Sequence, residues 1–512
     1  MEFITKTAML HRRVCSGCAG ASADGDLIVP DIKPDILKIL QVDGRVILTD
    51  EDISDGRLSV EGKVLFKVLY IPDRENEKIN CLEKSIDFSC NIDRPEITSQ
   101  MIYGLCADID RIDFHAVNSR KLRIKASVSI GYDIKLPKEF AIPVEIEDAP
   151  QMQLQKKSVS LYHISENSKR DFMLKESMEI PSGQTSIENL LRTDVAIKDK
   201  EQKIISGRIV TKGICNLCVL YTDPAGEIKF TEADIPFTEI FECDDIEENA
   251  RCEIDYTVGE VHTGISADSD GDMRIIDLEI SVQAAITASE LLETEMICDC
   301  YMPGCETLLS VEEPELDNVC AFGSGQLTLR DQASPSKNGP AMKGIYSVVT
   351  KTNVRSTNVM RDKTAVEGSV TCYILYLSES DDSPVYSCAK EIPFSHTIET
   401  PGSMPDMACE IKAEATHTGY SLNSAGDAEI RCILSLGVRV LKKEQLRLIE
   451  AVDTTPCDPS RRKGIIIYFV QPGEGLWDIA KHFRVNADTV LSLNDLEGSE
   501  IKPGVRLIVP SC

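Results

Sequence analysis

Cysteine is the residue type whose number and spacing in this chain most readily suggest chemistry. There are 19 cysteines among 512 residues, and two pairs have the Cys-x-x-Cys spacing found in zinc and redox sites. Cys15 and Cys18 form the first pair, and Cys215 and Cys218 form the second. Neither pair has a second half nearby, and residues i and i+3 of a strand face opposite sides. The spacing therefore argues against a zinc site at either pair.

A third group of cysteines lies in CDCYMPGC, where Cys298, Cys300 and Cys305 are followed by Cys320. A metal site and a set of buried or half-buried thiols both fit this spacing, and we favour thiols. Oxidative cross-linking of such thiols is a hypothesis that gels of reduced and unreduced protein would test. We expect no metal and no cofactor, and a flexible N-terminus around Cys15.

Residues for catalysis do not stand out. The seven histidines are scattered without HxH or HExxH spacing, and no P-loop, dinucleotide turn or Gly-x-Ser-x-Gly elbow occurs. Acidic pairs such as Asp244-Asp245 and Asp381-Asp382 occur in turn-like contexts, where solvated loops are the rule. Paired carboxylates for glycan cleavage stay open as an alternative. The prediction is a protein that is not an enzyme.

The net charge of −29 argues against binding to nucleic acid or to anionic membranes. No window reaches 18 apolar residues, so we expect no membrane insertion. The first residues lack the apolar centre of a secretory signal, which predicts a cytoplasmic protein. At this length we expect several domains.

A diverged repeat runs through the first 450 residues. Its most visible part begins with glycine and ends with tyrosine eight residues later: GKVLFKVLY from Gly62, GICNLCVLY from Gly213 and GSVTCYILY from Gly368. A phenylalanine follows each glycine after 24 or 26 residues: Phe88, Phe237 and Phe394. The period of 151 and then 155 residues makes each copy a domain of its own.

Within each copy, apolar and polar residues alternate with a period of two, which predicts antiparallel strands. A glycine inside a strand indicates a bulge or a close backbone approach. The fold class is therefore mainly β, with three tandem β-rich domains and a small α+β (βααβ) domain at the end. The expected ranges are 1–27 for an N-terminal segment, 28–150, 165–300 and 325–452 for the repeats, 453–463 for a polar linker and 464–510 for the last domain.

The last domain has the clearest local pattern. An apolar strand from Ile465 ends at Pro472-Gly473, and a two-turn helix with one apolar stripe follows. The residues of that stripe are Leu476, Ile479, Ala480 and Phe483. Asn486 can cap a second helix, and Pro503-Gly504 makes a turn into a closing strand. The order is strand, helix, helix, strand.

This stretch resembles a LysM domain, whose pattern is matched by Tyr468, Val470, Gly473, Leu476, Ile479, Ala480, Asn494, Gly504, Leu507 and Pro510. A LysM domain behind three β-rich repeats resembles the SPOCS-domain family of spore-forming Firmicutes, in its SipL type. The resemblance implies a spore-coat morphogenetic protein of the mother cell that gathers at the forespore surface. It also implies a partner, the basement-layer ATPase called stage IV sporulation protein A.

The resemblance further implies a groove for N-acetylglucosamine between two loops of the LysM domain. In this chain the candidate groove residues are Gly473, Glu474, Gly475, Leu476, Asn494, Asp495, Leu496 and Ile501. The first loop commonly reads Gly-Asp-Thr-Leu, and here Gly475 stands in place of threonine. Each hydrogen bond not made to a sugar hydroxyl costs about 0.5–1.5 kcal/mol. The lost hydroxyl argues against tight glycan binding.

Apolar residues offer the LysM domain a different surface. Ile465 and Ile467 should point away from the face that carries Tyr468. Trp477 is the only tryptophan in the chain, and Lys481 follows one helical turn later. Tryptophan is enriched at interface hot spots, so we expect Ile465, Ile467, Trp477 and Lys481 to form a patch that binds the ATPase. Simple packing of Trp477 against the domain's own flank is equally compatible with the sequence.

The sequence therefore favours a non-enzymatic scaffold of spore-coat assembly, with three β-rich units that contact other coat proteins or another copy of the chain. The alternative is a peptidoglycan-binding protein of the cell wall or cortex. A wall hydrolase is a third class, and it would require a catalytic carboxylate or nucleophile inside one repeat.

Overall fold

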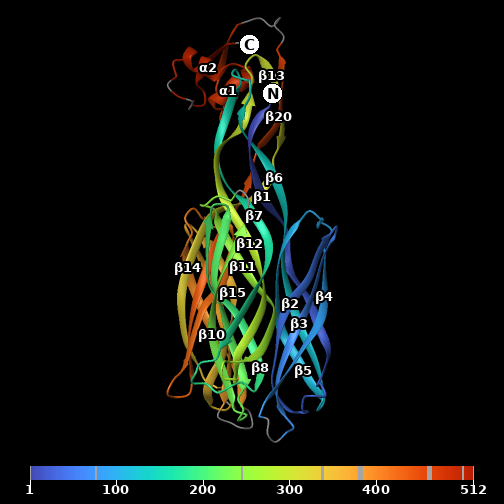
Figure 1. Cartoon of the computed structure of the whole chain (residues 1–512). Helices are drawn as coiled ribbons and strands as arrows, with labels where there is room; N and C mark the ends of the chain where they lie inside the picture. Colours follow the sequence, from blue (N-terminus) through green and yellow to red (C-terminus); the bar gives the residue numbers. More distant parts are fainter. Residues whose placement is uncertain are drawn as a thin grey trace.

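The computed structural model of the chain consists mostly of long antiparallel strands (Figure 1). It describes residues 2–74, 78–243, 246–335, 339–378, 384–457, 464–496, 498 and 501–510. The expected mainly-β fold with three tandem repeats and a small terminal module is confirmed. The pairs Asp244-Asp245 and Asp381-Asp382, and residues 458–463 of the expected linker, lie outside the described residues.

The first repeat consists of two three-stranded antiparallel sheets that pack face to face. The strands are β1 (Phe3–Ile28), β2 (Ile36–Ser54), β3 (Arg57–Pro72), β4 (Asn80–Asp93), β5 (Ile102–Asn118) and β6 (Lys121–Ile146). One sheet has the order β2-β3-β4 and the other β1-β6-β5. Alternate residues of β3 and β6 point inward, among them Val60, Phe66, Ile124 and Val128, and make one apolar core.

The second and third repeats have the same arrangement. The second contains β7 (Gln153–Glu179), β8 (Asn189–Ile205), β9 (Arg208–Thr222), β10 (Ile228–Glu242), β11 (Arg251–Ala267) and β12 (Met273–Tyr301). The third contains β14 (Glu315–Ala333), β15 (Met342–Met360), β16 (Lys363–Ser378), β17 (Val385–Glu399), β18 (Ala408–Leu422) and β19 (Ala428–Gln445). The sheet orders are β10-β9-β8 with β11-β12-β7, and β15-β16-β17 with β14-β19-β18.

The N-terminal residues differ from the flexible terminus that the sequence suggested around Cys15. They form β1, which pairs with β6 almost from end to end. Small residues such as Gly17, Gly20 and Ala23 weaken the alternation of β1, so the strand is difficult to recognise from the sequence. In the second and third repeats, β7 and β14 likewise begin ahead of residues 165 and 325.

The repeated glycines lie directly opposite the repeated phenylalanines. Gly62, Gly213 and Gly368 pair across the strands with Phe88, Phe237 and Phe394, respectively. A Cβ on Gly62 or Gly213 would lie 2.6 Å from the phenylalanine ring. The strand on the other side of each glycine also changes register there. Both readings of the glycine, bulge and close approach, are therefore confirmed.

Replacing Gly368 by alanine should lower the free energy of unfolding by about 1–3 kcal/mol, because the new methyl group would overlap the Asn353 carbonyl oxygen and the Phe394 ring. Gly104→Ala in β5 is the matched control. Its Cβ would meet nothing within 4 Å, so we expect a change within about 0.5 kcal/mol. Urea unfolding followed by circular dichroism measures both. Equal midpoints would contradict the steric role of Gly368.

The repeated tyrosine fastens each repeat to a segment that precedes it by 36 or 37 residues. The Tyr70 hydroxyl donates to the Pro34 carbonyl over 3.1 Å, and the Tyr376 hydroxyl donates to the Pro340 carbonyl over the same distance. In the second repeat the Tyr221 hydroxyl donates to Gln184 Oε1. These rings are fully buried. The tyrosine therefore has the same task in all three copies.

The leucines that precede the repeated tyrosines join the three repeats together. Leu69, Leu220 and Leu375 point away from the cores of their own repeats and meet in one apolar cluster. Leu191 and Tyr346, which hold matching positions in β8 and β15, belong to the same cluster. The repeats consequently lie side by side as one body (Figure 1).

A neck rises from the body toward both chain ends (Figure 1). The upper parts of β1 and β6, of β7 and β12, and the short pair β13 (Cys305–Glu312) and β20 (Leu448–Pro456) run together there. The neck has its own apolar core, which includes Met152, Ile297, Ile449 and Val452. The last residues of β20 occupy the start of the linker range expected from the sequence. The first two repeats thus contribute one pair of strands each to the neck, and β13 and β20, which lie just outside the third repeat in the sequence, form the third pair.

The terminal module lies at the end of the neck and has the expected strand, helix, helix, strand order. Its elements are β21 (Ile465–Phe469), α1 (Leu476–Phe483), α2 (Ala487–Leu493) and β22 (Arg506–Pro510). Leu476, Ile479 and Ala480 are buried on the inner stripe of α1. The Asn486 side chain caps α2 by accepting a hydrogen bond from the Asp488 amide. Among the described residues, no helix is long and apolar enough to cross a membrane.

Candidate functional site

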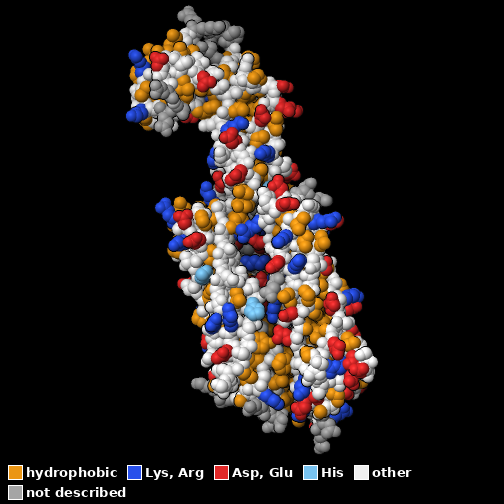
Figure 2. Space-filling view, turned by 60° about the vertical axis from the view of Figure 1, so that its left-hand side comes forward, with side chains coloured by type: hydrophobic (Ala, Val, Ile, Leu, Met, Phe, Trp, Pro, Cys, Tyr) orange, Lys and Arg blue, Asp and Glu red, His pale blue; other side chains and the backbone are white. Residues whose placement is uncertain are grey.

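The terminal module exposes an apolar row on its small sheet. Ile465, Ile467 and Phe469 of β21 are 72%, 60% and 56% exposed, and we call these three residues the open sheet face. Ile467 lies opposite Ile508 of β22, which adds a half-buried side chain to the row. Hydrophobic side chains are visible on the surface of the module (Figure 2). The predicted outward orientation of Ile465 and Ile467 is confirmed.

Trp477 and Lys481, the other two residues of the predicted patch, lie against the chain's own neck. The Trp477 indole N–H donates to the Asp299 carboxylate over 2.9 Å, and its ring packs edge-on against Tyr301 with centroids 5.0 Å apart. Lys481 Nζ lies 2.6 and 2.7 Å from the two oxygens of Asp299. The four residues of the expected patch therefore have different surroundings. Its two isoleucines are open, whereas Trp477 and Lys481 contact the end of β12.

The first candidate glycan loop uses its polar groups within the module. The Glu474 carboxylate accepts from the Gln471 amide at 3.0 Å and from the Tyr468 hydroxyl at 2.8 Å. These hydrogen bonds lower the pKa of Glu474. The Gly475 amide donates to Asp478 at the start of α1. The first loop thus has a carboxylate, but its hydrogen bonds are directed inward.

The second candidate loop also directs its polar side chain into the module. The Asn494 side chain exchanges two hydrogen bonds with the backbone of Ile508, at 2.6 and 2.7 Å, and donates a third to the Val490 carbonyl. Leu476, Leu496 and Ile501 pack in the apolar core of the module. The remaining candidates, Gly473 and Asp495, have positive φ angles of 92° and 50°. Asn494 therefore acts mainly as a brace between α2 and β22.

Two family models match this chain. The model described as SipL, SPOCS domain, matches residues 35–117, 186–266 and 342–423. The model described as LysM domain matches residues 468–510. No curated protein and no solved structure matches. The chain is a SipL-like protein with three SPOCS domains and a LysM domain.

SPOCS and LysM domains are binding domains without catalytic function, and their combination fits a sporulation-related adaptor that carries a module of the peptidoglycan-binding class. Each SPOCS match covers four strands, from β2 to β5, β8 to β11 and β15 to β18. The strands that flank each match complete the second sheet of the sandwich. In the first two domains the same strands continue into the neck, where β13 and β20 join them.

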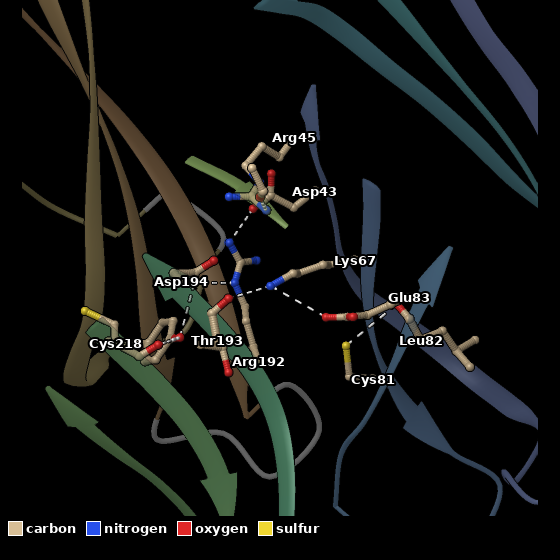
Figure 3. Close-up of polar contacts among 12 residues, drawn as sticks. Asp43, Arg45, Lys67, Cys81, Leu82, Glu83, Arg192, Thr193, Asp194 and Cys218 are labelled. Carbon is tan, nitrogen blue, oxygen red and sulfur yellow. Dashed lines mark hydrogen bonds and ion pairs between the residues drawn. The ribbon is translucent and has the colours of Figure 1, made fainter. Parts of the chain in front are cut away.

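The three SPOCS domains meet at a polar junction (Figure 3). Arg192 of β8 lies between two carboxylates, with Nε 2.5 Å from Asp194 and Nη2 2.6 Å from Asp43 of β2. The Tyr346 hydroxyl of β15 donates to Asp194 over 3.1 Å. Lys67 of β3 donates to the Thr193 carbonyl. These contacts surround a cavity of about 410 Å³ and join all three domains.

The charges at the junction stabilise one another. Burial disfavours the charged form of Arg192, but the carboxylates of Asp194 and Asp43 outweigh it and hold the pKa of this arginine above its usual value. Burial also works against ionisation of Asp194, and Arg192 more than compensates, so the pKa of Asp194 is lowered. Neither residue belongs to a motif that the sequence displays. The signal in the sequence is two charges at alternate positions, Arg192 and Asp194, in the otherwise apolar run LLRTDVAI.

The cysteines of the described residues are free thiols. Cys215 packs in the core of the second SPOCS domain and Cys218 in the cluster between domains, as their opposite faces predicted. Burial raises the pKa of Cys300 to about 11. Among the described residues, no three His, Cys, Asp or Glu side chains are grouped so that they could hold a metal ion.

Proposed function

We propose that this chain is a non-enzymatic scaffold of the endospore coat. Its LysM domain docks through the open sheet face to the coat basement-layer ATPase, stage IV sporulation protein A, at the forespore surface in the mother-cell cytoplasm. The SPOCS body presents surfaces to other coat proteins or to another copy of the chain. Ile465 and Ile467 contact the partner, whereas Trp477 and Lys481 hold the LysM domain on the neck.

The observation that carries the proposal is the contrast between the two sides of the LysM domain. Three large apolar residues in a row are more than half exposed on β21, and exposed apolar rows mark protein interaction sites. The polar groups of the candidate sugar loops, in contrast, make hydrogen bonds inside the module. An apolar face suits a protein surface better than it suits the hydroxyl groups of a glycan.

Ile467→Lys in the full chain tests the proposal. A charge at the centre of the open sheet face would be buried on docking, so the dissociation constant for the purified ATPase should rise at least ~100-fold. Ile205→Lys is the matched control, because Ile205 is an isoleucine of similar exposure, 51%, in the second SPOCS domain. Surface plasmon resonance measures both variants. Wild-type affinity in Ile467→Lys would refute docking through this face.

Peptidoglycan binding is the second candidate function, and the match to the LysM model favours it. Sedimentation with insoluble peptidoglycan separates the two candidates. The scaffold proposal predicts that the full chain stays in the supernatant. Sedimentation that is unaffected by Ile467→Lys and competed by chitin oligomers would support glycan binding instead.

A further inference from the structure

The LysM domain is seated on the neck by two buried side chains at the end of β12. Asp299 and Tyr301 are 7% and 2% exposed, and we call them the seat. Both oxygens of the Asp299 carboxylate face Lys481 Nζ, and one of them also accepts from the Trp477 indole. A buried carboxylate is costly without a counter-charge. Lys481 supplies that charge, so the contact holds α1 against β12.

Tyr301 belongs to the apolar core of the LysM domain although it lies in the strand of a SPOCS domain. Its hydroxyl donates to the Val485 carbonyl over 2.8 Å, between α1 and α2. Beside it the Gly304 amide donates to the Arg484 carbonyl over 2.8 Å. The seat therefore uses side chains and backbone together, which fixes the orientation of the LysM domain relative to β12.

The seat and the open sheet face are different surfaces of the LysM domain. Trp477 is half-buried, with its indole N–H bonded to Asp299 and its ring against Tyr301, whereas Ile465 and Ile467 are mostly exposed. A partner that took the indole N–H as a donor would first have to break its hydrogen bond with Asp299. A partner that touches the open sheet face leaves those contacts intact.

We propose that Asp299 and Tyr301 are positioning residues for docking of the LysM domain. They orient the open sheet face on the neck, and Trp477 acts in docking only through its contact with the seat. The proposal rests on the proposed function, because it concerns the orientation in which the same face meets the ATPase. Nothing in the LysM sequence itself points to Asp299, which lies 178 residues before Trp477.

Trp477 reports on its own surroundings because it is the only tryptophan in the chain. In the full chain labelled with 5-fluorotryptophan, ¹⁹F NMR should show one resonance from an indole bonded to Asp299. Asp299→Ala should shift that resonance and increase its broadening by a soluble paramagnetic agent. Addition of unlabelled ATPase to the wild type should leave the resonance at its original position. Movement to the Asp299→Ala position on binding would overturn the proposal.

A double-mutant cycle provides a second test. Asp299→Ala and Trp477→Phe, which keeps an aromatic ring but loses the N–H donor, should each weaken ATPase binding ~10-fold. Together they should weaken it no more than Asp299→Ala alone, because the Trp477 hydrogen bond is one of the contacts that Asp299→Ala already removes. The loss of affinity caused by Ile467→Lys should multiply with the loss caused by either of these variants. A ~100-fold loss in the Asp299→Ala, Trp477→Phe double variant would instead assign two independent roles and overturn the proposal.

One conservative variant and two earlier measurements separate the possible failures. Asp299→Asn keeps an acceptor for the indole and loses the ion pair, so its effect on binding should lie between wild type and Asp299→Ala. Its thermal unfolding should likewise lie between that of the wild type and that of Asp299→Ala. If the wild-type chain does not bind the ATPase, the proposed function is refuted. If the ¹⁹F resonance is the same in wild type and Asp299→Ala, the seat is refuted whatever the partner.

Discussion

Arg192→Met should lower the free energy of unfolding by about 3–5 kcal/mol, the cost of removing one partner from a buried ion pair. Arg192 is 6% exposed. Its guanidinium donates hydrogen bonds to Asp194 of its own domain and to Asp43 of the first SPOCS domain. Methionine preserves much of the aliphatic volume but leaves Asp194 without its counter-charge. The junction between the domains should therefore open before the individual sandwiches unfold.

Arg57→Met is the matched control. Arg57 also bonds a carboxylate, Asp93, at 2.6 Å, but both side chains are at least half exposed. Exposed pairs contribute about 1 kcal/mol or less. Urea unfolding by circular dichroism measures stability, and small-angle scattering shows separation of the domains. If the two variants unfold alike, the buried network does not stabilise the body.

Phe237→Ala should destabilise the second SPOCS domain by about 3–5 kcal/mol. The ring is 7% exposed, covers Gly213, and lies 5.8 and 5.9 Å from the rings of Phe172 and Tyr256. Truncation leaves a cavity lined by these groups. Because aromatic neighbours add to the cost, the effect should exceed that of most single substitutions.

Phe114→Ala serves as the comparison for this change, because Phe114 is 46% exposed at the end of β5. Exposed substitutions of this kind usually alter stability by about 0.5 kcal/mol or less. Both variants are compared by thermal unfolding at one scan rate. A loss in Phe237→Ala no larger than in Phe114→Ala would mean that the repeated glycine and phenylalanine do not form a packing unit.

The repeat explains how much of the fold the sequence predicts. Gly62, Tyr70 and Phe88 recur at nearly fixed offsets, and the structure gives each of them one local task in all three copies. Such tasks depend on near neighbours in the chain, so they leave a visible pattern. The LysM domain is recognisable for the same reason, since its core positions follow two short helices and a turn.

Pairing over long distances leaves no such pattern. β1 pairs with β6, more than a hundred residues later, and its small residues hide the alternation. Alternation indicates which residues of a strand face inward but not which strand lies beside it. Trp477 illustrates the same limit. Its size and position predict an interface, yet the residues that cover it, Asp299 and Tyr301, lie in another domain.

The length of β12 has a mechanical consequence. This strand begins inside the SPOCS body, where it pairs with β11, and ends at the seat; its 29 residues span roughly 95 Å at the rise of an extended strand. Tension between the two ends of the molecule is directed along the strand, so many hydrogen bonds with β7 must slide at once rather than separate one by one. The strand therefore fixes the distance between the LysM domain and the far end of the SPOCS body.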